Sequence, residues 1–92
     1  MMSHTLIHDE AACGYEYHID GYVAFIGYDD QDGNMHLVET QVPKELAGQG
    51  LARELLEDVL NEIEKDNKKA VAKCSYIEKY QEKNPDKSDI FA

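Results

Sequence analysis

The sequence has little of what marks a secreted, membrane-bound or disulfide-stabilised protein. It contains two cysteines, two prolines and no tryptophan in 92 residues. No apolar run approaches the roughly 18 residues of a membrane span, and the first residues lack the basic segment and apolar stretch of a secretory signal. One pair of cysteines is few for a secreted scaffold, so we expect Cys13 and Cys74 to be free thiols. These absences favour a cytoplasmic protein with no membrane partner.

Positive charge is also scarce. Nine lysines and arginines stand against 19 aspartates and glutamates, which gives a formal net charge of −10. Such a surface repels nucleic-acid phosphates unless a concentrated basic patch overcomes the repulsion. The lysines between residues 65 and 73 follow or alternate with acidic residues, and we interpret them as a solvated helix end. We therefore expect no nucleic-acid partner, and the acidic surface favours a cationic substrate such as an amine.

Length and apolar content fit one small domain, residues 1-92, around one modest core, since 42% of the residues are hydrophobic. Segments rich in aromatic and β-branched residues, separated by turn sequences, predict three antiparallel strands in a meander: Tyr15–Ile19, Tyr22–Tyr28 and Met35–Gln41. The first turn is Asp20-Gly21, whose glycine tolerates the positive φ of a tight hairpin, and the second is the longer Asp29–Asn34. A further short strand is expected at Thr5–His8.

The apolar spacing changes after Pro43, which ends the third strand because proline cannot donate to the ladder. Apolar residues three and four apart then form one stripe, typical of an amphipathic helix from about Gly48 to Asn67: Leu51, Leu55, Leu56, Val59, Leu60 and Ile63. The lysines that follow Asn67 suit the negative end of this helix.

The remaining segments predict one more strand and one more helix. Ala70–Cys74 is a short, apolar candidate strand. Ser75-Tyr76-Ile77-Glu78 matches a capping box, in which the Ser75 hydroxyl caps a helix that begins at Tyr76 and ends before Asn84-Pro85. We expect an irregular tail over Asp86–Ala92. The order β-β-β-α-β-α predicts an α+β fold.

A loop with two glycines, Gly48 and Gly50, joins the third strand to the long helix. The first-turn amides of a helix have no intrahelical partner and lie at the positive end of its dipole. Glycines remove the Cβ atoms that would hold a phosphate away from those amides, although a plain tight turn would need the same glycines. No Gly-Lys-Ser/Thr follows, which excludes a P-loop, and Arg53 stands where a dinucleotide fingerprint needs a small residue.

This segment resembles the acyl-CoA loop of the GNAT N-acetyltransferase superfamily, Gln/Arg-x-x-Gly-x-Gly/Ala. The match is Gly48-x-Gly50 with Ala52, whereas Glu45 stands at the Gln/Arg position and Ala47 replaces a usual arginine. Both departures remove positive charge near a polyanion. The resemblance implies acetyl-CoA or coenzyme A as co-substrate, with no metal. It also implies pantetheine contacts from Thr40 and Val42 and pyrophosphate contacts from the loop: Leu46, Ala47, Gly48, Gln49, Gly50, Leu51 and Ala52.

A narrower resemblance, over about Tyr15 to Pro85, is to very small GNAT proteins that lack the N-terminal helices of the larger enzymes. It rests on four motifs in order: Thr40-Gln41-Val42-Pro43, Gly48-Gln49-Gly50, Cys74-Ser75-Tyr76 and Asn84-Pro85. This resemblance implies a minimal GNAT-like fold, and it implies Cys74 as the proposed catalytic residue beside the acyl thioester.

Cys74 lies at the predicted strand end, immediately before a helix. The positive end of that helix favours the thiolate. By the resemblance to the small GNAT proteins, Cys74 could carry the acetyl group before an amine takes it. Direct attack by the amine, with Cys74 only lining the pocket, is the alternative, and an inert buried cysteine is another. Cys13 lies in a candidate loop, and we assign it no role.

Glu39 is a candidate general base for an incoming ammonium group, although an ordinary exposed carboxylate fits the sequence as well. The histidines have no ligand-like spacing with the cysteines, so we expect no metal site. His36 alternates with Val38 and Thr40, which predicts that the three share one strand face, and we interpret it as a packed or surface residue.

Three functions remain open on the sequence: an N-acetyltransferase that acts on an unidentified amine, a non-catalytic acyl-CoA-binding module, and an interaction domain that has lost the ligand. The missing N-terminal helices favour the second, because in the larger enzymes they wall the acceptor site. An open edge strand in so small a sheet is compatible with a monomer or a weak homodimer.

Overall fold

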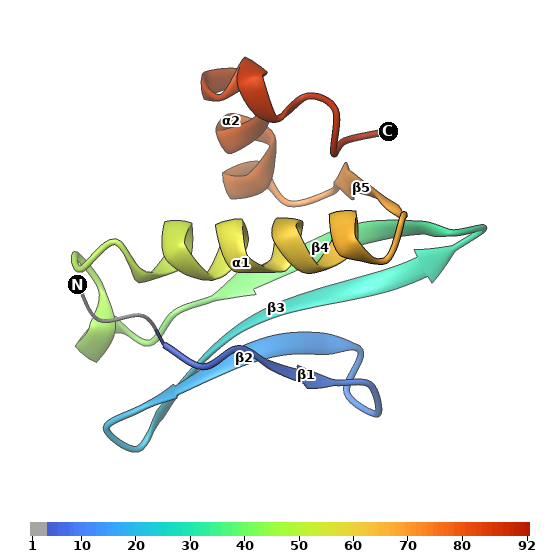
Figure 1. Cartoon of the computed structure of the whole chain (residues 1–92). Coiled ribbons are helices and arrows are strands. Elements are labelled where there is room, and N and C mark those ends of the chain that lie inside the picture. The colour runs from blue at the N-terminus through green and yellow to red at the C-terminus, as the bar shows by residue number, and fades with distance from the viewer. Residues whose placement is uncertain (1–3) are drawn as a thin grey trace.

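A computed structural model describes residues 4–92 and confirms the predicted α+β class. Five strands form one sheet in the order β1-β2-β3-β4-β5, with neighbours antiparallel except for the parallel pair β4 and β5 (Figure 1). The strands are β1 Ile7–Asp9, β2 Gly14–Ile19, β3 Tyr22–Gln31, β4 Asn34–Gln41 and β5 Lys69–Ala72. The first strand was expected at Thr5–His8. It begins two residues later and ends one residue later than expected, which is the usual uncertainty of strand ends.

Both hairpins turn through an aspartate and a glycine with positive φ. Asp20 and Gly21 have φ of 51° and 83°, and Asp32 and Gly33 have φ of 55° and 81°, as a tight type I′ turn requires. The first turn is as predicted. The second prediction was wrong in length, because β3 continues through Asp29–Gln31 and only Asp32 and Gly33 form the turn. Polar residues fit a strand there because this end of the sheet is exposed.

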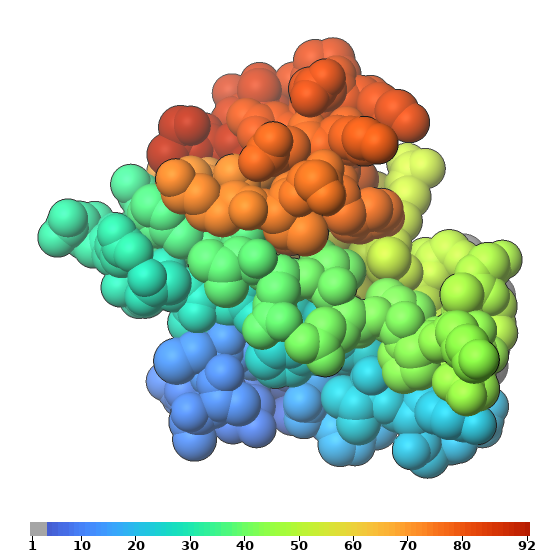
Figure 2. All heavy atoms as spheres, turned by 180° about the vertical axis from the view of Figure 1, so that it is seen from behind, coloured from blue at the N-terminus to red at the C-terminus, as the bar shows by residue number. Residues whose placement is uncertain are grey.

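Two helices lie on one side of the sheet: α1 Leu51–Lys65 and α2 Ser75–Lys83 (Figure 1). The six apolar residues of the predicted stripe on α1 are all buried. They face sheet residues that alternate along β2, β3 and β4, among them Tyr15, Tyr17, Ile26 and Leu37. Viewed from behind, β4 and the strands β1 and β2 have no helix across them (Figure 2). Neither helix in residues 4–92 has the length and apolar content needed to cross a membrane.

The C-terminal tail is part of the core, which corrects the prediction of an irregular segment. Pro85–Lys87 form a short 3-10 helix, and Ile90 and Phe91 are buried. The Ala70 amide donates to the Ile90 carbonyl, and the Ala92 amide donates to the Ala70 carbonyl, both over 2.8 Å. The tail thus adds a parallel bridge on the free edge of β5. The three residues that make this contact, 90–92, are too few to show a helical or strand period in the sequence, so only the packed structure reveals it.

A β-bulge in β4 changes which face its last residues occupy. Tyr28 pairs with Leu37 while its neighbour Gly27 pairs with Glu39, so Val38 has no partner on β3. Leu37 and Thr40 therefore face the core side, opposite Tyr28 and Ile26, and Val38 and Glu39 face the open side. The prediction that Thr40 shares a face with His36 was wrong, because regular alternation cannot anticipate the bulge.

Candidate functional site

The strands β4 and β5 separate at the centre of the molecule. Their last pair is Leu37 with Ala72, after which the Lys73 amide still donates to the Leu37 carbonyl over 3.0 Å. Beyond this point β4 continues to Gln41, whereas the chain after β5 turns into α2. Among the described residues, positions 38–41 of β4 thus have no strand partner on the β5 side. Such a backbone edge can pair with an extended polar ligand.

Cys74 lies in this opening. Its thiol is half-buried and lies 3.8 Å from the Thr40 hydroxyl, toward which it can donate. Cys74 was predicted as the last residue of β5, but the strand ends at Ala72 and Cys74 is instead the N-cap of α2. Its carbonyl accepts the Glu78 amide over 2.9 Å. Cys13 is exposed on the turn between β1 and β2, and both cysteines are free thiols, as expected.

The predicted capping box does not form. Ser75 is the first residue of α2 rather than its cap, and no side chain caps the helix. The chain turns one residue earlier than the sequence suggests because Cys74 has the extended backbone, φ −112° and ψ 137°, that an N-cap position takes. This shift places the thiol, rather than the serine hydroxyl, at the start of the helix.

The glycine loop borders a hollow of about 200 Å³. Its walls include most of the residues that the sequence assigns to the ligand: Val42, Leu46, Ala47, Gly48, Gly50, Leu51 and Ala52. Thr40, Gln49 and Cys74 do not line it. Gly48 and Gly50 have φ of 80° and 73°, so α1 begins at Leu51 and not at Gly48 as predicted.

The amides of this loop fall into two groups. Those of Leu46 and Ala47 already donate to the carbonyls of Pro43 and Lys44, over 2.9 and 3.1 Å, within the 3-10 turn Lys44–Leu46. The first intrahelical bond of α1 comes from the Glu54 amide to the Gly50 carbonyl, so the amides before it have no acceptor inside the helix. The free donors of the loop are therefore at the start of α1.

Glu39 does not lie with the other candidates. Its side chain is on the open side of the sheet, beside Gly27, and accepts a hydrogen bond from the Gln41 amide nitrogen over 2.6 Å. Thr40, the next residue, points to the opposite side, toward Cys74. The structure therefore brings Thr40 next to Cys74 and Val42 next to the glycine loop, and it places Glu39 on the other side of β4 from Thr40.

Two residues that the sequence did not assign to the site complete it. Arg53 and Tyr76 line the loop hollow, and both also line a second hollow of about 340 Å³ between α1 and α2. Burial raises the pKa of Tyr76, and the nearby Arg53 lowers it in part. The motif Cys74-Ser75-Tyr76 was a signal for Tyr76. In the sequence, Arg53 served only to exclude the dinucleotide fingerprint, and no local pattern marked it as a residue of the site.

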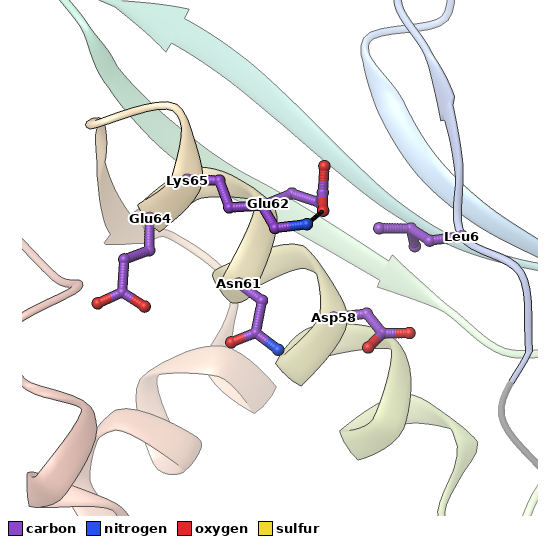
Figure 3. A pocket seen from close by; sticks show the side chains of 6 residues that line it. All are labelled: Leu6, Asp58, Asn61, Glu62, Glu64 and Lys65. Carbon is purple, nitrogen blue, oxygen red and sulfur yellow. Dashed lines mark hydrogen bonds and ion pairs between the residues drawn. The ribbon is translucent and has the colours of Figure 1, made fainter.

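A hollow of about 420 Å³ lies elsewhere, at the C-terminal half of α1 opposite Leu6 (Figure 3). Three carboxylates, Asp58, Glu62 and Glu64, line it, and Lys65 is paired with Glu62 over 3.2 Å. These acidic groups repel phosphates. This hollow at α1 is larger than the hollow beside the glycine loop, but its acidic lining does not suit an acyl-CoA. Residues 4–92 contain no cluster of three His, Cys, Asp or Glu that could hold a metal ion.

The comparisons with known proteins identify the family of this chain. The family model described as GCN5-related N-acetyl-transferase matches residues 14–90. The chain therefore belongs to the GCN5-related N-acetyltransferase family and is an acetyltransferase by family. No curated protein matches it. Among solved structures it is similar to a GCN5-like protein from Staphylococcus aureus, studied by NMR, with a TM-score of 0.75, 25% identity, and coverage of 100% of this chain and 91% of the other.

Proposed function

We propose that the protein binds acetyl-CoA in the opening between β4 and β5 and transfers the acetyl group to a primary amine. The observation that supports this most is the convergence of Cys74, Thr40 and the unpaired end of β4 beside the glycine loop. The pantetheine arm of acetyl-CoA would pair with residues 40–42 of the chain. The pyrophosphate would meet the free amides that begin α1, where the helix dipole is positive.

In the covalent route, the Cys74 sulfur attacks the thioester carbonyl carbon, and coenzyme A leaves with the thiol proton. The amine nitrogen then attacks the same carbon, the bond to the Cys74 sulfur breaks, and the amine proton returns to the thiol. In the direct route, the amine attacks acetyl-CoA itself and Cys74 only lines the thioester pocket. Thr40, 3.8 Å from the thiol, is positioned to orient the sulfur in either case.

The matched pair Cys74→Ala and Cys13→Ala tests the role of the thiol, because the chain offers a second free cysteine outside the opening, on the turn between β1 and β2. Acetyl-CoA binding is followed by amide NMR, and intact-mass spectrometry follows acetylation of the protein. We expect saturable shifts centred on residues 46–52 and on Cys74. In the covalent route, Cys74→Ala keeps the binding and loses both acetyl-protein and turnover, while Cys13→Ala loses neither. In the wild-type protein, turnover without acetylated protein would indicate the direct route. Binding of acetyl-CoA without turnover would indicate a binding module. The absence of shifts at millimolar ligand would refute the proposal.

We further propose Glu39 as the group that takes the proton from the amine, approaching from the open side of the sheet. It is an exposed carboxylate one residue from Thr40, and general bases contribute about 10²–10⁴-fold to rates. Glu16→Gln is the control for Glu39→Gln, since Glu16 lies on the same open side, opposite Phe25. We expect a rate loss of about 10²-fold in Glu39→Gln alone. Equal rates in the two variants would exclude Glu39 as the base.

A further inference from the structure

The groove between α1 and α2 carries an unusual concentration of positive charge. It has a volume of about 340 Å³ and is lined by Arg53, Tyr76, Lys79, Tyr80, Lys83 and Asn84. Three of the chain's nine basic residues line it, and none of its 19 acidic residues does. In a protein with a net charge of −10, this groove is a local exception. It therefore suits an anion.

Helical spacing explains how the basic groups are separated from the acidic ones. Positions 76, 79, 80 and 83 of α2 lie three and four residues apart, so they share one face, which is turned toward α1. Glu78 and Glu82, on the same helix, do not line the groove and are exposed. Tyr80 is the buried residue of this face, and Lys79 and Lys83 lie at its rim.

The floor of the groove is held by Glu57 of α1. Its carboxylate accepts the Tyr80 hydroxyl over 2.9 Å and the Arg53 Nε over 3.4 Å. Lys79 and Lys83, in contrast, make no ion pair or side-chain hydrogen bond with any residue between 4 and 92. Glu57 thus fixes the aromatic floor, and the two lysines keep their charge for an external partner.

The groove is continuous with the glycine loop, because Arg53 and Tyr76 line both hollows. A ligand with one phosphate group at the loop and another in the groove would connect the two. Before its glycines this chain has Glu45 and Ala47 at the two positions where the motif that it resembles is polar or basic, which leaves Lys44 as the one basic residue of the segment. Positive charge from the groove would offset that loss.

We propose that the groove is a phosphomonoester site that recognises the 3′-phosphate of coenzyme A through Lys79, Lys83 and Arg53. The inference rests on the proposed function, since it places the pyrophosphate of the same molecule at the loop. A phosphomonoester is dianionic near neutral pH and offers three acceptor oxygens, which suits mobile ammonium donors. The site then discriminates coenzyme A from dephospho-coenzyme A, which differs only in lacking that phosphate.

The test is a calorimetric titration of the wild-type protein with coenzyme A and with dephospho-coenzyme A. We expect coenzyme A to bind about tenfold more tightly, a difference of about 1.4 kcal/mol. The double variant Lys79→Ala/Lys83→Ala should lose this preference through weaker binding of coenzyme A alone, and Lys79→Arg/Lys83→Arg should keep it. The control Lys65→Ala/Lys68→Ala removes the same charge from the far end of α1 and should also keep the preference. Added salt should reduce the preference.

Each of the other outcomes contradicts one defined part of the proposal. Equal affinities for the two ligands in the wild type, or a preference that survives Lys79→Ala/Lys83→Ala, would overturn the 3′-phosphate site and leave acetyl-CoA binding at the loop intact. An equal loss in Lys65→Ala/Lys68→Ala would assign the preference to net charge instead of the groove. If neither ligand binds the wild type, the proposed function fails and the inference fails with it. Inorganic phosphate alone, titrated as a competitor, should displace coenzyme A only weakly, because it occupies the groove without the loop.

Discussion

Alanine at Gly48 and alanine at Gly33 should destabilise the protein equally and differ only in ligand binding. The two glycines have nearly the same φ, 80° and 81°. A Cβ atom at either position would meet no other atom within 4 Å. The two substitutions therefore add the same conformational strain, one in the candidate ligand loop and the other in a hairpin turn at the far end of the sheet.

The size of the strain follows from the backbone alone. An L-residue in the left-handed region costs about 1–2 kcal/mol relative to glycine, and no steric clash adds to it here. For a domain of 60–100 residues, 1 kcal/mol lowers Tm by about 4–8 °C, so each variant should melt roughly 4–16 °C below the wild type. The added methyl group in Gly48→Ala also lies on the surface that a phosphate would approach.

Urea unfolding and acetyl-CoA titration of both variants test this reasoning. We expect matching losses of stability, together with weaker acetyl-CoA binding in Gly48→Ala alone. Stability losses that differ by more than about 1 kcal/mol would refute the assumption that the backbone region decides the cost. Equal affinities in Gly48→Ala and Gly33→Ala would show that the loop does not contact the phosphates.

Three further predictions concern the rest of the fold. Gly14→Ala should lower stability in urea by about 1–3 kcal/mol, because its Cβ would lie 2.1 Å from the Phe25 ring, and Phe25→Leu should recover part of the loss; an unchanged midpoint would contradict this. Phe91→Ala should cost about 3 kcal/mol or more, and a loss below 1 kcal/mol would mean that the tail is not packed. Burial and the bond to Glu57 raise the pKa of Tyr80 to about 12 from 10.0, so its stabilising contribution is complete below pH 10 and is lost as pH rises toward 12. Alkaline unfolding should therefore be less steep in Tyr80→Phe, and an identical slope would exclude Tyr80.

Local signals were sufficient for the outline of the fold. The Asp20-Gly21 turn fixes the first hairpin, and the apolar stripe identifies α1, because both depend on residues close together in sequence. The end of β3 was missed because Asp29–Gln31 have the composition of a turn. The tail was missed because the burial of Ile90 and Phe91 depends on β5, about twenty residues earlier.

The candidate site was predictable in part for the same reason. The glycine loop and Cys74 are each marked by a short motif, and the structure places Cys74 beside Thr40 and the loop beside Val42, two residues further along the chain. Lys79 and Lys83 carry no motif, and the role that we propose for them depends on which face of α2 turns toward α1. That orientation is a property of the packed core. Likewise, no pattern in β4 indicated that Glu39 and Cys74 would lie on opposite sides of the sheet.

The bulge at Val38 has a consequence for how the chemistry of this chain could be changed. One unpaired residue in β4 decides that a hydroxyl, Thr40, rather than a carboxylate, Glu39, faces the thiol. Regular alternation of the same residues would place Glu39 on the side of Leu37, toward Cys74, so the bulge selects the hydroxyl. Deleting Val38 would not reverse this, because Glu39 would still pair with Gly27 and Thr40 with Ile26. The pairing of β4 thus separates a neutral neighbour for the sulfur from an anionic one, which makes the bulge, as much as the composition of β4, a determinant of reactivity.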